Sequence, residues 1–269
     1  MATNPPVVIT SIDAGLSSLA VDDRPVPHQT AILLMPAVFG IAFLVAPVVG
    51  ALGLVWPAEF PLIEASCLLV PALVAARVTT GSVRGALALR WPTGRVIAGA
   101  LLFGSTFWYL NLVLVAPLLQ DYTSASDRAL GQALAEEAPL LLELAVLALV
   151  PAVCEEILVR GAIARGLAAR FGPLAAVLVS SAYFALLHLS LARALPTFVL
   201  GTASAAIVLR TRSLVPAIII HGLHNAAALV LTEPSMAAAT LAIGSRPELA
   251  LAVGAGGSVA GLFMLLHRR

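Results

Sequence analysis

Two adjacent carboxylates and an arginine lie inside an apolar, helix-length segment, in the pattern Glu155-Glu156-x-x-x-Arg160. An ionisable group at the centre of a membrane helix costs roughly 2.5–3.5 kcal/mol on insertion scales, so a chain that places three there is expected to use them. Glu156 and Arg160 are four residues apart and can pair on one helix face. Glu155 is rotated by about 100° and has no partner nearby in the sequence, which makes it a candidate general base. The alternative is that both glutamates lie at the cytoplasmic membrane surface, beside water and Arg165.

Two further patterns follow in separate apolar segments. In Phe184-x-x-x-His188, the phenylalanine ring precedes the histidine by one turn, where it can close off a site or serve only for packing. In His221-x-x-x-Asn225, an imidazole and a carboxamide share a helix face and can donate hydrogen bonds to one developing oxyanion. His224 lies three residues from His221, so one alternative is that it joins the site, but the preferred expectation is that it contacts solvent or lipid headgroups near the helix end.

Together, and in this order, the three patterns predict a buried polar site. A Glu155–His188 pair would activate a water molecule, opposite a His221/Asn225 pair that stabilises a tetrahedral intermediate. This is the chemistry of peptide-bond hydrolysis inside a membrane. The chain has no H-E-x-x-H, G-x-G-D, G-x-S-G or P-loop motif, so zincin-like, aspartyl and rhomboid-type proteases and ATP-driven transporters are unsupported.

The composition places these residues in elements that cross a membrane. Of the 269 residues, 60% are hydrophobic and only 11% are charged, whereas a soluble domain has about 25% charged residues. The net charge of +1 gives no argument for a nucleic-acid partner. Cys67 and Cys154 both fall in apolar segments and are expected to be small buried side chains rather than a disulfide framework.

Hydropathy predicts an all-α polytopic membrane protein, a bundle of about eight transmembrane helices with the polar active site within the bundle. The apolar runs lie at about 31–56, 61–76, 96–119, 139–160, 174–189, 195–209, 214–231 and 248–266. With straight helices, Glu155 would lie toward the cytoplasmic half and His188 near the outer end. We therefore expect the glutamate helix to extend past Arg160 toward Leu167, and the short fifth helix to be sunk in the bundle.

The runs also divide the chain. Residues 1–30 are expected to be a mobile polar cytoplasmic tail rather than a signal peptide, because they lack a basic N-terminal region and contain several Asp and Pro residues. Residues 31–120 would contain the N-terminal transmembrane helices, with a basic loop at 77–95 that is either an interfacial segment facing anionic lipid or an ordinary loop. Residues 139–231 would form the catalytic helices and 248–269 the C-terminal transmembrane helix.

Arginine placement predicts the orientation. All fifteen basic residues are Arg. With a cytoplasmic N-terminus, twelve of them lie on or near the cytoplasmic side and only Arg128, Arg193 and Arg246 face outward, as the positive-inside rule requires. Both termini are therefore expected to be cytoplasmic. High Ala and Arg content without Lys indicates a GC-rich bacterial genome, so the expected location is the bacterial cytoplasmic (inner) membrane.

The three patterns resemble those of the CPBP family of intramembrane proteases (CAAX protease and bacteriocin-processing, also called Abi), whose eukaryotic members are the type II CAAX prenyl endopeptidases. The family pattern is E-E-x-x-x-R, F-x-x-x-H and H-x-x-x-N or a variant. The resemblance covers about 139–231 and includes Gly161 after the first motif and the stretch 212–217 before the third. The first three apolar runs resemble the family only in being apolar.

The resemblance implies a role for each motif residue. Glu155 would be the base that activates water, and His188 would help to hold that water. His221 and Asn225 would form the oxyanion site.

Glu156 and Arg160 would be mainly structural on the same resemblance, as a pair that fixes the glutamate helix. The family is often described as metalloproteases, but a glutamate mechanism requires no cofactor. A divalent metal such as zinc would have Glu155, His188 and His221 as its ligands, although nothing in their spacing demands it.

The first hypothesis is therefore an endopeptidase that acts on a protein or peptide substrate at the membrane, in contact with the lipid bilayer and not with nucleic acid. Its substrates could be secreted peptide precursors, peptides in self-immunity or tails of exported proteins; prenylation need not be assumed. The second hypothesis is a non-catalytic membrane scaffold, or an ion or peptide transporter, that uses the same polar cluster. The third is a cluster that only fixes helix packing, although membrane hydrogen bonds average well under about 1–2 kcal/mol.

Overall fold

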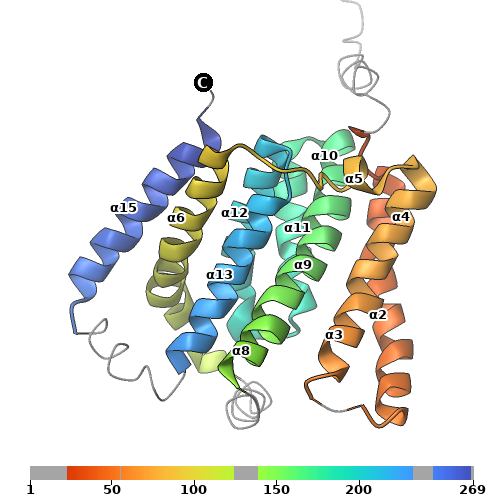
Figure 1. Cartoon of the computed structure of the whole chain (residues 1–269), viewed down its shortest axis with the longest axis horizontal. Helices are drawn as coiled ribbons and strands as arrows, with labels where there is room; N and C mark the ends of the chain where they lie inside the picture. Colours follow the sequence, from red (N-terminus) through yellow and green to blue (C-terminus); the bar gives the residue numbers. More distant parts are fainter. Residues whose placement is uncertain (1–22, 55, 124–138, 233–244, 268–269) are drawn as a thin grey trace, which may run out of the picture.

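The computed structural model describes residues 23–54, 56–123, 139–232 and 245–267, and these ranges contain helices and connecting turns without strands. Eight helical spans of the described chain run roughly side by side as one bundle (Figure 1). The spans are α2 (His28–Ala51); α3, η2 and α4 (Glu59–Glu64, Ala65–Leu69, Val70–Thr80); α6 and η3 (Gly94–Leu110, Asn111–Val115); α8, η6, α9, η7 and α10 (Leu140–Glu143, Leu144–Leu149, Val150–Glu156, Ile157–Ala164, Arg165–Phe171); α11 (Pro173–Leu187); α12 (Leu191–Thr211); α13 (Val215–Thr232); and α15 (Pro247–Leu266). Short helices α5 (Val83–Ala86), η4 (Ala116–Leu118) and η5 (Gln120–Tyr122) lie between them.

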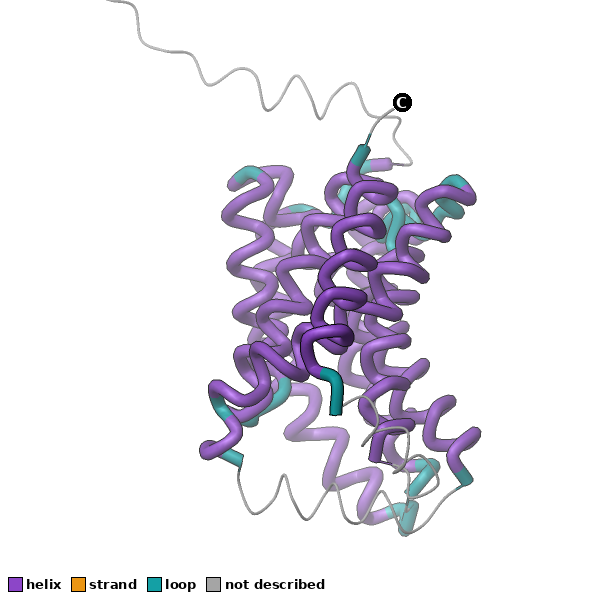
Figure 2. Tube along the Cα trace, turned by 90° about the vertical axis from the view of Figure 1, so that its left-hand side faces the viewer, coloured by secondary structure: helices purple, strands orange, loops and turns teal. Residues whose placement is uncertain are grey.

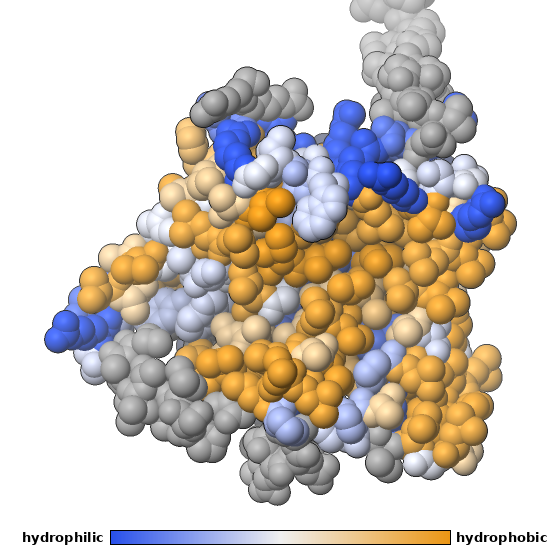
Figure 3. Space-filling view, in the orientation of Figure 1, coloured by the Kyte–Doolittle hydropathy of each residue, from blue (hydrophilic) through white to orange (hydrophobic). Residues whose placement is uncertain are grey.

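The outer surface of the bundle is apolar. Four described helical stretches are long and apolar enough to cross a membrane, and two shorter apolar helices accompany them. The four are His28–Ala51, Glu59–Thr80, Leu191–Thr211 and Pro247–Leu266. Hydrophobic side chains cover most of the face in Figure 3, and hydrophilic ones gather at one end. The prediction of an all-α polytopic membrane protein is confirmed.

The helix that carries the glutamate motif is long. Its segments α8 to α10 follow one another without a break from Leu140 to Phe171, so the expected extension past Arg160 is present. The α9 segment that ends in the glutamate pair lies between two π-helical segments, η6 and η7. π-Helical turns are rare and occur frequently at functional sites.

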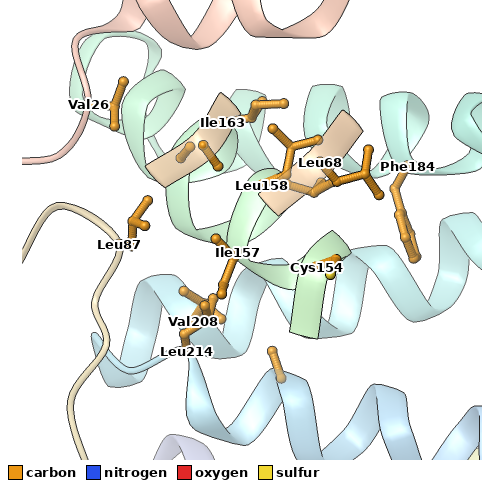
Figure 4. Close-up of a cluster of buried hydrophobic side chains, with 14 of the residues drawn as sticks. Val26, Leu68, Leu87, Cys154, Ile157, Leu158, Ile163, Phe184, Val208 and Leu214 are labelled. Carbon is orange, nitrogen blue, oxygen red and sulfur yellow. The ribbon is translucent and has the colours of Figure 1, made fainter. Parts of the chain in front are cut away.

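The core of the bundle surrounds this helix. Leu158 and Ile163 are fully buried and belong to one apolar cluster with Phe184 of α11 and Leu214 before α13 (Figure 4). Close approach of α6 to α13 depends on Gly104. A Cβ at this position would lie 2.9 Å from Leu223 Cδ1 and 3.1 Å from the Cα of Ile220. The glycine thereby sets the depth and rotation of α13, which carries the third motif.

The 77–95 stretch contains both exposed and buried residues, and whether it faces anionic lipid stays a prediction. Its middle is buried in the bundle rather than lying on the surface: Leu87 is fully buried, and a Cβ at Gly161 would be 3.3 Å from its side chain. The carbonyl of Ala88 accepts a hydrogen bond of 3.0 Å from the backbone of Leu214. Trp91 remains exposed. The apolar residues of this loop therefore fill one end of the bundle. Their burial was hard to predict from the sequence because arginines alternate with them.

The described ends of the chain meet this loop at one end of the bundle (Figures 1 and 2). Arg90 forms an ion pair with Asp23, and Arg95 donates to the carbonyl of His267. Arg165 of α10 donates to the loop backbone at 2.8 Å and to the carbonyl of Asp23 at 3.3 Å. The far end of the glutamate helix is thereby tied both to the loop and to the first described residues.

The positions of the arginines at the two ends of the bundle are compatible with the predicted orientation of the chain. Arg193 lies in the first turn of α12 and Arg246 precedes α15, both at the opposite end. Arg128 and residues 1–22 of the predicted tail lie outside the described residues. Which end faces the cytoplasm stays a prediction, as does the division of the chain into the predicted regions.

Candidate active site

Glu156, Arg160 and His221 form a fully enclosed ionic frame. Arg160 Nη1 lies 2.9 Å from Glu156 Oε1, and both side chains have no exposed surface. The contact is ionic rather than a well-aligned hydrogen bond. His221 Nδ1 lies 3.1 Å from the same carboxylate oxygen. Because a carboxylate oxygen only accepts, Nδ1 carries the hydrogen of this bond, which fixes the orientation of the imidazole ring.

Glu155 lies on the other side of the same imidazole. Its Oε2 is 3.6 Å from His221 Nε2, which is longer than a hydrogen bond. No hydrogen-bond partner of this buried oxygen is found among the described residues. Glu156 also has one buried oxygen, Oε2, without a partner among the described residues. The two glutamates therefore differ in that Arg160 and His221 hold Oε1 of Glu156, whereas Glu155 has no such close partner and faces the cavity described below.

Phe184 contacts residues of all three motifs. Its ring lies under the Arg160 guanidinium, with Cζ 4.0 Å from the ring centroid. It also meets the rings of His188 and His221 edge to face, at centroid distances of 5.1 and 5.5 Å. Gly201 of α12 permits this arrangement, since a Cβ there would lie 3.1 Å from Arg160 Nη2 and 3.3 Å from the phenylalanine ring. Phe184 thus orients the polar side chains as well as packing the core.

His188 ends α11 and faces the interior. Its Nδ1 is 3.0 Å from the carbonyl oxygen of Phe184. A carbonyl oxygen only accepts, so Nδ1–H is the donor and Nε2 of the neutral ring is left as an acceptor. Nδ1 is therefore anchored to the backbone, and Nε2 can accept a hydrogen bond from a bound molecule.

Two adjoining cavities collect the predicted catalytic residues. The first, of about 510 Å³, is lined by Glu155, His188 and Asn225, one residue from each motif. The second, of about 520 Å³, is lined by His188, His221 and Asn225. His188 and Asn225 line both. Each volume falls within the range of ligand pockets, about 300–1,000 Å³, so an extended peptide segment can reach all four side chains.

The expectation for His224 is wrong. It does not point to solvent at a helix end but lines the second cavity with His221 and Asn225. The physical reason is helical periodicity: residues at i, i+3 and i+4 share one face of a helix. The alternative that the spacing from His221 suggested, in which His224 joins the site, is the one that the structure favours.

Sequence reasoning also missed four residues of the first cavity: Trp56, Glu59, Glu64 and Arg193. None belongs to a motif. Glu64 is the most unusual, because its Oε2 is buried without a hydrogen-bond partner in the described part of the chain. The only signal for it was an isolated carboxylate within the second apolar run.

The described residues do not fit a metal site. No group of three or more His, Cys, Asp and Glu side chains gathers there in a way that could hold a metal ion. This includes the set Glu155, His188 and His221.

Comparison with known proteins gives one match, and it covers the site. No curated protein and no solved structure matches the chain. The family model described as Type II CAAX prenyl endopeptidase Rce1-like matches residues 137–227. This stretch includes every motif residue and leaves the first three spans outside. At the family level, and over this part of the chain, the match confirms the resemblance to the CAAX proteases that the three motifs predict.

Proposed function

We propose that this protein is an intramembrane endopeptidase that hydrolyses peptide bonds of membrane-associated proteins or peptides. The observation that carries the proposal is the convergence of the three motifs: Glu155 of α9, His188 at the end of α11 and Asn225 of α13 line one cavity inside an apolar bundle. The family match supports the same class of reaction. A scaffold has no need for an open carboxylate at such a cavity.

In the proposed reaction, Glu155 is the base. A water molecule at its carboxylate loses a proton to Glu155 while the water oxygen attacks the carbonyl carbon of the scissile bond. His188 Nε2, which the Phe184 carbonyl leaves as an acceptor, holds the second hydrogen of this water. The amide π electrons move to the carbonyl oxygen, which becomes the oxyanion.

Asn225 is the more direct donor to that oxyanion. Its carboxamide lines both cavities and carries N–H donors in every state. His221 is bound to Glu156 through Nδ1, so it offers a second hydrogen at Nε2 only when the ring is charged. We therefore assign His221 to the alignment of Glu155, 3.6 Å away, and to the oxyanion together with Asn225, both when Nε2 is protonated.

The proposed substrate is a segment that reaches the cavity from the membrane. The cavity is lined by the beginning of α3 and α12 and the end of α11, so it lies nearer the end of the bundle opposite the loop at 77–95 (Figure 1). In the predicted orientation this is the outer half of the membrane. Exported and membrane proteins are therefore the proposed substrates, and prenylation is not required.

The test compares protein termini in cells that carry native Glu155 or Glu155→Gln, at equal levels of folded protein. Defined termini of exported or membrane proteins should disappear in the variant, because the amide cannot accept the proton of water. A matched control is Glu248→Gln, which neutralises an exposed carboxylate at the start of α15, away from the cavities.

With a purified enzyme and a peptide that spans such a terminus, Glu155→Gln should lower kcat by at least about 100-fold, the scale of general base catalysis. If no terminus changes while a phenotype of the gene persists in the variant, the protein acts as a scaffold or transporter and the proposal fails.

A further inference from the structure

Glu64 is a half-buried residue whose carboxyl group the reaction proposed above does not use. It is the last residue of α3, within the membrane-spanning stretch Glu59–Thr80. Its Oε2 is buried and has no hydrogen-bond partner among the described residues. A carboxylate inside a membrane segment is costly and usually marks a functional site. Because of this cost, we expect Glu64 to have a functional role.

The position of Glu64 connects it to the catalytic motif. It lines the first cavity together with Glu155, His188 and Asn225. Its helix packs against α9, the segment that ends in the glutamate pair. Two carboxyl groups thus face one cavity from two different helices.

Two carboxyl groups that line one apolar cavity are not readily ionised together, because like charges repel strongly in a low dielectric, so we assign one shared proton to the pair. The surroundings decide which member keeps the proton. Glu155 Oε2 has the basic nitrogen His221 Nε2 at 3.6 Å. In the described part of the chain, no cationic side chain contacts the carboxyl group of Glu64. Glu155 is therefore the carboxylate that accepts, and Glu64 the acid that can donate.

We propose that Glu64 is a further catalytic residue of this site, the general acid that protonates the departing amine. The inference rests on the proposed peptidase function and adds a second carboxyl group to it. Peptide hydrolysis requires a proton on the leaving nitrogen, because an amide anion is too basic to leave. A protonated carboxyl group in the cavity provides one at the atom where it is needed.

The step balances. When the tetrahedral intermediate collapses, the oxyanion electrons re-form the carbonyl and the C–N bond breaks. The bonding pair goes to the nitrogen, which takes the proton of Glu64 and leaves as the amine. The proton that Glu155 took from water then passes to the Glu64 carboxylate, so both groups return to their starting states. One water and one amide become one carboxylic acid and one amine.

The test uses two substrates that differ only in the leaving group. One is a peptide that spans a cleavage site found by terminus mapping, and the other is the aryl ester of the same acyl segment. A phenolate departs without a proton, so the ester does not need the acid. Glu64→Gln should lower kcat for the peptide by about 100-fold or more, with KM little changed, and kcat for the ester by less than about tenfold.

A purely structural role for Glu64 would lower both rates equally, and that result would overturn the proposal. So would peptide turnover by Glu64→Gln at the wild-type rate, or an effect confined to KM. Glu64→Asp retains the acid and should restore part of the peptide rate, which keeps the test decisive if the Gln variant folds poorly. Glu248→Gln is the matched exposed control.

Glu155→Gln separates this inference from the proposed function. If Glu155→Gln abolishes turnover of both substrates and Glu64→Gln affects neither, only the inference about Glu64 fails. If Glu155→Gln leaves peptide turnover intact, the glutamate mechanism itself fails, whatever Glu64 does.

Discussion

Replacement of Arg160 by Met removes one member of the buried ionic frame and keeps a long, apolar side chain in its place. The Glu156 carboxylate then stays at zero exposure, with His221 Nδ1 at 3.1 Å as its remaining partner. The cation over the Phe184 ring is also lost. The variant therefore tests whether the frame stabilises the bundle by charge or only by volume.

The expected loss of stability follows from these contacts. Removing one partner of a buried ion pair costs about 3–5 kcal/mol, because the other charge is left without compensation. A desolvated cation–π contact contributes about 2 kcal/mol, of which a methionine sulfur beside the same ring recovers about 0.3–1.5 kcal/mol. Since these effects overlap, we expect Arg160→Met to lower the free energy of unfolding by about 4 kcal/mol.

The decisive measurement is a double-mutant cycle with Glu156→Gln. In the double variant, both charges are gone, and the new side-chain amide oxygen can still accept the hydrogen of His221 Nδ1. The double variant should be more stable than Arg160→Met alone, with an interaction energy of at least about 2 kcal/mol between the two sites. Unfolding by SDS in mixed micelles, followed by the fluorescence of the three tryptophans, gives the four free energies.

Two results would refute the reasoning about the frame. One is a loss below about 1 kcal/mol for Arg160→Met, the range of an ordinary point mutant. The other is additivity, in which the double variant loses the sum of the two single losses. Either would mean that the 2.9 Å contact does not carry the charge compensation inferred from it.

Two further predictions concern the walls of the site. Gly201→Ala should destabilise the bundle by about 1–3 kcal/mol through overpacking, because its Cβ would press on Arg160 Nη2 at 3.1 Å and on Phe184 at 3.3 Å. Gly256→Ala, whose Cβ would have no atom within 4 Å, is the control in the same unfolding assay. Equal stability of the two variants would contradict the packing inferred around Gly201. Asn225→Ala should lower kcat for a cleaved peptide by about 10²–10³-fold with KM little changed, as for the loss of an oxyanion donor; an effect on KM alone would assign Asn225 to substrate binding instead.

The spans were predictable because the bilayer sets their length, but their ends were not. The predicted run 139–160 continues as helix to Phe171, although its last turns are rich in Gly, Ala and Arg and contain only three large apolar residues, Ile163, Leu167 and Phe171. These turns are buried by protein instead of lipid. A Cβ at Gly166 would lie 2.7 Å from the carbonyl oxygen of Val26, so a small residue serves close packing that hydropathy cannot report.

Contacts within one helix were predictable, and contacts between helices were not. The four-residue spacing was enough to expect the approach of Glu156 to Arg160, which the structure has at 2.9 Å. The same pattern gives no information on the rotation of α13 relative to α9. That rotation is set by packing such as the approach of α13 to Gly104, and it places His221 between the two glutamates rather than opposite them.

Glu64 was beyond sequence reasoning because a single carboxylate in an apolar run has no spacing to interpret. The role of Glu64 depends on the side chains that line the cavity with it. Glu156 is balanced by Arg160 at 2.9 Å and His221 at 3.1 Å, whereas Glu155 has its nearest basic nitrogen at 3.6 Å and Glu64 has none in contact within the described chain. Charge compensation thus separates the carboxylate that holds the bundle together from the two that remain free to exchange protons, and a substrate carbonyl in this cavity would meet the latter.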